Sequence, residues 1–168
     1  AHPRGVQVYP NEGLNEPPPK FKLYTTRDAR PPLAAVDDHG KDVLPRISRI
    51  DREYPDDFRL QNIRGFADEH TLTLTLPNAD HVKLLLTGWT DYAWSSDNLA
   101  ASQSGRSLSL PALQVKDKDG QWKTVIENIG IPVGRPQTIV ADLTGKFLSA
   151  SREVRIVTNM RIYWDQIL

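Results

Sequence analysis

The stretch Thr71-Leu-Thr-Leu-Thr-Leu76 decides the fold class that we predict for this chain. Its residues alternate between polar and apolar, which puts the leucines on one face of an extended strand and the threonines on the other. A strand shows this alternation when one face packs on a core and the other meets solvent. Residues 153–164 follow the same period of two, with an apolar face made by Val154, Ile156, Met160, Ile162 and Trp164.

Turn residues and short apolar runs continue this pattern from Phe21 onward, as is typical of all-β domains. They predict further strands near residues 21–26, 33–37, 82–90, 112–117, 121–126 and 136–142. Helical signals are limited to Asp42–Glu53, with Pro45 in the first turn, and to Asp97–Ser102, which begins with a capping residue. We therefore predict an all-β fold: a two-sheet antiparallel β-sandwich, jelly-roll-like, with one or two short helices.

The faces of these strands separate a predicted core from a predicted outer surface. The side chains expected to be buried are Leu72, Leu74, Leu76, Leu84, Leu86, Val115, Ile139, Ile156, Ile162 and Trp164. Arg161, Tyr163 and Asp165 alternate with the last two of them and should point outward. They predict a polar stripe that protects an edge strand against pairing or contacts a neighbouring domain.

The length of 168 residues suits one domain that buries most of its apolar surface. Five of the 13 prolines fall within residues 1–20, ending in Pro17-Pro18-Pro19. Proline lacks an amide hydrogen and favours extended polyproline conformations. We therefore expect an extended proline-rich arm or linker over residues 1–20 and a single β-sandwich domain over residues 21–168.

Charge and composition exclude several classes of partner and site. The 21 basic and 21 acidic residues balance, whereas nucleic acids and anionic membrane surfaces are bound by a clustered excess of basic residues. No apolar run approaches the roughly 20 residues that span a bilayer, so we expect no membrane insertion. The absence of cysteine excludes disulfides, thiol nucleophiles and Cys-based zinc sites, and the four histidines lack chelating spacing.

Two Asp- and Gly-containing segments predict β-hairpins: Asp37-Asp-His-Gly-Lys-Asp42 and Asp117-Lys-Asp-Gly120. Both are also similar to oxygen-rich calcium loops, with Asp117 and Asp119 as candidate ligands. Calcium takes about six to eight oxygen ligands, and neither segment is followed by a correctly spaced terminal Glu. The turn interpretation is favoured. A calcium ion held between the sheets by residues distant in sequence is the alternative, and no other cofactor is expected.

Aromatic and hydrogen-bonding side chains are concentrated where the strand near 82–90 ends. Flat aromatic rings stack on the C–H faces of sugar rings, while carboxylates and amides fix the hydroxyls. The segment therefore predicts a carbohydrate platform. The competing interpretation is that these rings close the sandwich as part of its core. The candidate ligand-binding residues are Trp89, Asp91, Tyr92, Trp94, Asp97 and Asn98.

Several runs carry a resemblance to a known family: Tyr54–Phe58, Leu86–Trp94, Asp97–Gln103, Pro136–Gly145 and Val157–Ile167. They resemble a C-terminal domain of large secreted bacterial proteins that carry FG-GAP propeller repeats and ASPIC/UnbV modules, sometimes with tetratricopeptide repeats. The resemblance covers roughly residues 30–168. It implies an exported multidomain parent, an extracellular or periplasmic location and an accessory role, and that domain has no assigned reaction.

No constellation of nucleophile, base and orienting group can be read from the chain. There is no Gly-x-Ser-x-Gly elbow and no Gly-rich phosphate loop. We therefore expect a non-catalytic accessory module that binds a glycan or a neighbouring domain. Two alternatives stay open: a polysaccharide hydrolase or lyase whose Asp and Glu residues converge only in the fold, and a purely structural domain that docks onto neighbouring repeats.

Overall fold

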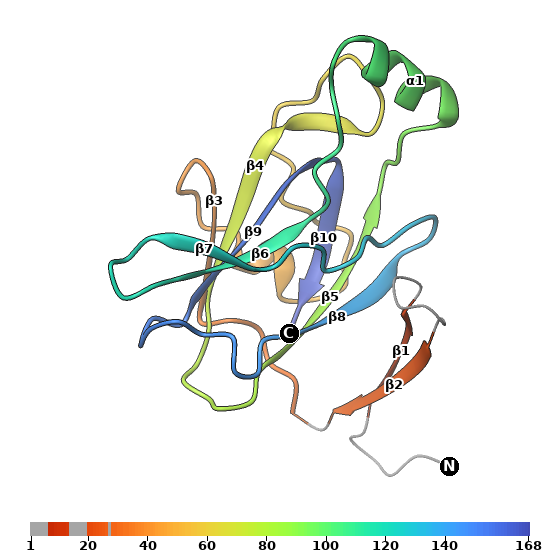
Figure 1. The fold of residues 1–168 in the computed structure, drawn as a ribbon. Coiled ribbons are helices and arrows are strands. Elements are labelled where there is room, and N and C mark those ends of the chain that lie inside the picture. The colour runs from red at the N-terminus through yellow and green to blue at the C-terminus, as the bar shows by residue number, and fades with distance from the viewer. Residues whose placement is uncertain (1–6, 14–19, 27) are drawn as a thin grey trace.

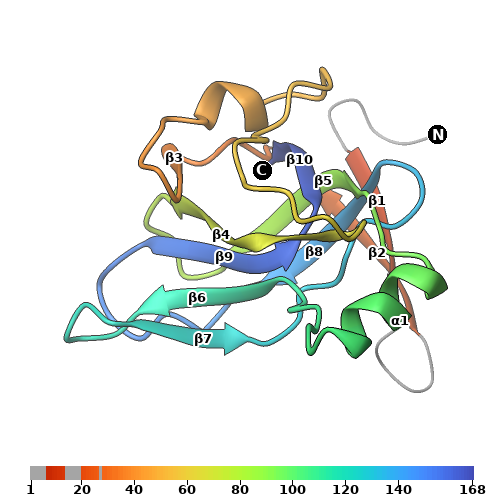
Figure 2. The same ribbon diagram turned by 90° about the horizontal axis from the view of Figure 1, so that it is seen from above.

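The computed structural model describes residues 7–13, 20–26 and 28–168, and two antiparallel sheets form its main body (Figure 1; Figure 2). The five-stranded sheet has the order β3 (Ala34–Asp37), β4 (Phe66–Thr75), β9 (Glu153–Met160), β6 (Ala112–Lys116) and β7 (Trp122–Ile126). The three-stranded sheet has the order β10 (Ile162–Ile167), β5 (Lys83–Thr90) and β8 (Gln137–Asp142). The predicted all-β, two-sheet sandwich is confirmed.

A separate two-stranded sheet precedes the sandwich. Its strands β1 (Gln7–Gly13) and β2 (Lys20–Thr26) pair antiparallel along their full length. Within the predicted extended arm over residues 1–20, β1 is extended and lies outside both sheets of the sandwich, but it pairs with β2. Pro10 fits there because each strand of a two-stranded sheet is an edge strand, where proline is tolerated. Residues 1–6 and 14–19 of the predicted arm lie outside the described residues, and Lys20 begins β2.

The segment predicted as one strand over residues 153–164 is two strands in different sheets. β9 lies between β4 and β6, whereas β10 pairs with β5 in the other sheet. The chain crosses between the layers at Arg161 (Figure 2). The alternation continues through the crossing, since Met160 and Ile162 are both buried in the core. The period of two therefore identified the buried face correctly but concealed the change of sheet.

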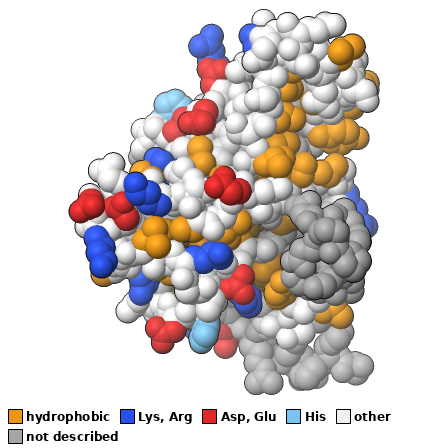
Figure 3. Space-filling model, in the orientation of Figure 1, with side chains coloured by type: hydrophobic (Ala, Val, Ile, Leu, Met, Phe, Trp, Pro, Cys, Tyr) orange, Lys and Arg blue, Asp and Glu red, His pale blue; other side chains and the backbone are white. Residues whose placement is uncertain are grey.

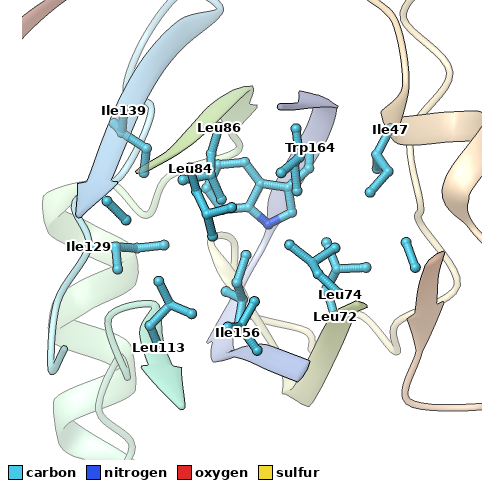
Figure 4. Packing of buried hydrophobic residues seen from close by; sticks show 14 of the residues in the cluster. Ile47, Leu72, Leu74, Leu84, Leu86, Leu113, Ile129, Ile139, Ile156 and Trp164 are labelled. Atoms are coloured by element: carbon cyan, nitrogen blue, oxygen red, sulfur yellow. The ribbon is translucent and has the colours of Figure 1, made fainter. Parts of the chain in front are cut away.

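The core lies between the two sheets, and all ten side chains predicted to be buried are buried. Figure 4 shows the indole of Trp164 between Leu84 and Leu86 on one side and Leu74 and Ile156 on the other. Both layers thus contribute to one continuous apolar cluster, which stabilises the sandwich by removing apolar surface from water.

Gly88 explains how Trp164 fits against β5. A Cβ atom at position 88 would lie 2.4 Å from the carbonyl oxygen of Tyr163 and 3.1 Å from the indole of Trp164. Only glycine allows the two backbones to approach this closely. The sequence suggests a bulge or bend in β5 at Gly88, but β5 pairs with β8 without a break, and the irregularity falls in β10 between Trp164 and Gln166.

The two predicted hairpin turns are confirmed and have the same construction. In the first, Asp37 Oδ1 accepts hydrogen bonds from the backbone N–H groups of His39 and Lys41, at 3.0 and 2.8 Å. Asp117 Oδ1 does the same for the N–H groups two and four residues further on, both at 2.9 Å. Gly40 and Gly120 then adopt φ values of 77° and 75°, which favour glycine.

Two short helices complete the fold, and both differ in extent from the predicted ones. The 3₁₀-helix η1 (Leu44–Ile47) covers only the start of Asp42–Glu53, with Pro45 in its first turn as expected. The helix α1 (Ser95–Gln103) is longer than the single turn that the sequence indicated. No helix among the described residues has the length and apolar character to cross a membrane.

Candidate ligand-binding surface

The six candidate binding residues do not form one surface. Trp94 is 56% exposed and Tyr92 is 42% exposed, and Asn98 is exposed on the first turn of α1. Figure 3 shows apolar side chains gathered on the flank of the molecule that adjoins α1. Trp89 lies in a separate aromatic stack, and Asp91 and Asp97 are bonded to protein groups that hold Trp94. We call the exposed set of Tyr92, Trp94 and Asn98 the aromatic platform.

The start of α1 fixes the backbone of Trp94. The backbone N–H of Trp94 donates to Asp97 Oδ2 at 2.9 Å, and the N–H of Asn98 donates to the carbonyl oxygen of Trp94 at 2.9 Å. The bond to Asp97 satisfies an N–H group that a helix N-terminus otherwise leaves without a partner, and the bond from Asn98 is the first backbone bond of the helix itself. One carboxylate oxygen of Asp97 therefore serves the helix rather than a ligand.

The side chain of Trp94 is also held in place. The Arg64 guanidinium lies over the indole, with its central carbon 4.6 Å from the ring centroid. Arg64 Nε in turn donates to Asp91 Oδ1 at 2.8 Å. Next to Arg64 in the chain, a Cβ atom at Gly65 would lie 2.4 Å from the backbone nitrogen of Ala93. The backbone at Gly65 is therefore in close contact with the backbone that precedes Trp94. Trp94 thus combines a large exposed ring with a supported position.

Arg161 anchors the segment that carries Arg64. Its guanidinium donates to the carbonyl oxygens of Phe66, Gln61 and Ile63 at 3.0, 2.6 and 3.1 Å, and Nη1 donates to Asp91 Oδ2 at 3.2 Å. The carboxylate of Asp91 therefore lies between two guanidinium groups. With both oxygens engaged, Asp91 positions the platform and is not a free acceptor for sugar hydroxyls.

The predicted outward polar stripe of Arg161, Tyr163 and Asp165 is wrong. The Arg161 side chain is only 14% exposed, and Asp165 is 3% exposed. Asp165 Oδ1 accepts hydrogen bonds from the backbone N–H groups of Asp51 and Arg52, at 3.1 and 2.9 Å. Arg52 has a φ of 67°, a left-handed conformation that these bonds help to stabilise. The irregular segment 48–65 covers this face of β10.

Trp89 belongs to a stack of aromatic rings rather than to the platform. Its indole stacks on Tyr163 at a centroid distance of 4.6 Å, and Tyr54 meets both rings edge-on. Phe58 contacts Tyr163 at 5.3 Å and stacks on His70 at 4.2 Å. The rings of Tyr54 and Phe58 thereby fasten segment 48–65 to the outer face of β5 and β10. Trp89 thus packs on the outer face of β5 and lies outside the core between the sheets, whereas Trp94 and Tyr92 are exposed.

His70 makes the stability of this stack depend on pH. Burial against Phe58 lowers the pKa of the imidazole below its ordinary value of 6.5, although the carbonyl oxygen of Asp68, 2.9 Å from Nδ1, opposes the shift. The unfolded chain therefore binds a proton more readily than the folded chain does. The free energy of unfolding should be highest above about pH 6.5 and should fall as the pH drops toward the lower, folded-state pKa.

Urea unfolding of the wild type and His70→Phe at a series of pH values from 8 to 5 tests this expectation. The variant keeps the ring stacked on Phe58 but has no proton to gain. We expect the wild type to lose more stability than the variant as the pH falls. Parallel pH profiles for the two proteins would contradict the prediction.

The acidic loops offer weaker candidates for a site. Ligand atoms of Asp37, Asp38 and His39 lie within 4.8 Å of one another. The adjoining cavity, which Asp57 and His70 also line, has a volume of about 30 Å³. That is room for about one or two water molecules and far too little for a sugar ring. Carboxylates from Asp37, Asp38 and Asp57 thus lie around a cavity that is too small to hold a sugar ring.

The candidate calcium ligands Asp117 and Asp119 stand in the second hairpin turn. Asp117 uses Oδ1 for the turn, and Oδ2 lies 3.7 Å from the ammonium group of Lys123. The turn and this ion pair lower the pKa of the Asp117 carboxyl, so it is a charged structural group at neutral pH. The structure thus gives Asp117 a structural role in the hairpin, as its Asx-type sequence pattern indicates.

Comparisons with known proteins found no match: no family model, no curated protein and no solved structure is significantly similar to the chain.

Proposed function

We propose that the protein is a non-catalytic binding module that presents the aromatic platform to a carbohydrate. The observation that carries the proposal is the state of Trp94, which is more than half exposed and yet supported by Arg64, Asp97 and the close contact at Gly65. Exposed tryptophan is costly in water, whereas an aromatic ring held in one orientation loses little conformational freedom on binding. A supported and exposed indole is therefore suited to stacking on a sugar ring.

The contacts available on the platform indicate how a sugar would be held. Tyr92 adds a second exposed ring with a hydroxyl that can both donate and accept, and Asn98 adds an amide. Because Asp91 and Asp97 are engaged with protein groups, stacking rather than charge should supply most of the affinity. An exported multidomain parent, as the resemblance implies, would give such a module an accessory role outside the cell.

A second candidate function uses the same surface for a protein partner. Leu99 is 60% exposed on α1, close in sequence to Trp94, and aliphatic side chains are typical of protein contacts rather than of sugar contacts. The surface would then dock onto a neighbouring domain of the parent protein. Leu99→Ala distinguishes the two functions, because it should weaken docking and leave sugar binding unchanged.

Trp94→Ala is expected to abolish glycan binding on an array and to reduce affinity in calorimetric titration by at least about tenfold, or about 1.4 kcal/mol. The stacking surface is lost, while the backbone bonds that start α1 remain. Trp122→Ala is the matched control, because Trp122 lies under Arg155 and Lys116 on the five-stranded sheet. An unchanged melting temperature shows that Trp94→Ala is folded.

Two results would count against the proposal. One is a wild-type protein that binds no glycan on a broad array. The other is a Trp94→Ala variant whose affinity for a bound glycan stays within twofold of the wild type.

A further inference from the structure

A second and larger cavity lies at the end of the sandwich away from α1 (Figure 1). It is lined by the end of β2, by residues 28–32, by the loop between β4 and β5 and the start of β5, and by Leu168. Its volume is about 460 Å³. Small-molecule sites in proteins occupy roughly 300–1,000 Å³, so this end cavity has the size of a ligand site.

The inner wall of the end cavity is apolar and belongs to the rigid part of the fold. Leu76, Leu84 and Leu85 line it, and all three are buried core residues at strand positions or directly beside them. Pro31 and Pro32 form part of the opposite wall, and their fixed φ angles limit how far that wall can collapse. An apolar molecule would replace water against these surfaces, which is favourable.

Charged side chains are found among the exposed lining residues. Arg30 and Lys83 contribute positive charges and Asp28 contributes a negative one, while His81 adds an imidazole. The ammonium group of Lys83 is paired with the carboxylate of Asp142 on β8. Arg30 is therefore the lining group best suited to a ligand anion, because a guanidinium binds a carboxylate through two parallel hydrogen bonds.

We propose that the end cavity binds a small amphipathic carboxylate. Its apolar body lies against Leu76, Leu84 and Leu85, and its carboxylate pairs with Arg30. This site goes beyond the proposed function, because none of its lining residues belongs to the aromatic platform and the ligand is of a different chemical class.

Calorimetric titration of the full chain with decanoate, below its micellar concentration, tests the proposal. We expect saturable binding at one site, and at least tenfold weaker binding of decanol, which has the same chain without the charge. Arg30→Gln should weaken the binding of decanoate by a similar factor. The matched control Arg135→Gln changes an exposed arginine outside the cavity and should leave the affinity for decanoate unchanged.

A cavity-filling variant separates this site from other apolar surfaces. Ala79 lines the cavity and is exposed, so Ala79→Trp places a large side chain in the space with little strain on the core. Decanoate binding should disappear in Ala79→Trp and persist in Trp94→Ala, which alters only the platform. The proposal is overturned if the wild type shows no saturable binding, if decanol binds as tightly as decanoate, or if folded Ala79→Trp binds normally.

Discussion

Replacing Arg161 with methionine is expected to lower the free energy of unfolding by about 3–5 kcal/mol, the range found when one partner of a buried ion pair is removed. Methionine keeps much of the apolar stem but removes the guanidinium, which contacts three backbone carbonyl oxygens and Asp91. The three carbonyl oxygens belong to residues 61–66, which lie outside regular secondary structure until β4 begins at Phe66. Arg161→Lys should recover only part of the loss, since an ammonium group cannot reproduce the planar fork.

Urea unfolding monitored by tryptophan fluorescence provides the measurement. Arg64→Met is the control, because Arg64 also pairs with Asp91 but its side chain is exposed, so its loss should cost at most about 1 kcal/mol. If the free energy of unfolding of Arg161→Met lies within about 1 kcal/mol of the wild-type value, the anchoring role assigned to Arg161 is wrong.

Leu74→Ala and Ile156→Ala should each cost about 2–5 kcal/mol. Both side chains are buried where the two sheets meet, one from β4 and one from β9, and each truncation leaves a cavity that the neighbouring strands cannot fill. Chemical denaturation checks the loss against Leu33→Ala, in which an exposed leucine is shortened. Costs below about 0.5 kcal/mol at both core sites would mean that the assigned faces are reversed.

The sequence was sufficient for the features that depend on local pattern. Alternation within 71–76 identified the buried face of β4, and the Asp-to-Gly spacing at Asp37 and Asp117 identified two turns of the same construction. In each case the interacting groups lie within a few residues of one another. Side-chain period and turn chemistry therefore contained the necessary information.

The sequence was insufficient where a side chain meets backbone groups from a distant segment. Arg161 and Asp165 hold residues 51–66, about a hundred positions earlier in the chain, through carbonyl and N–H groups that every residue possesses. No residue type marks such partners. The polar stripe was therefore predicted to face solvent.

The candidate site shows the same limit. The sequence located the aromatic segment, but the fate of each ring depends on residues elsewhere. Tyr163 and Tyr54 cover Trp89, whereas Arg64 lies over the ring of Trp94, which remains 56% exposed. The split between a packing tryptophan and a platform tryptophan is thus a property of the assembled fold.

The position of β9 and β10 in the chain has a consequence for biosynthesis. During translation, β3 to β8 are synthesised before β9 and β10. In the folded sheet, however, β9 lies between β4 and β6 and pairs with both, and β10 is the second neighbour of β5 beside β8. Until residues 153–167 have been synthesised, these strands present unpaired backbone edges, which are prone to associate with other chains. The β6–β7 hairpin can form early because its contacts are local. The two layers themselves should assemble late, so the nascent chain depends on protection of its edges during translation.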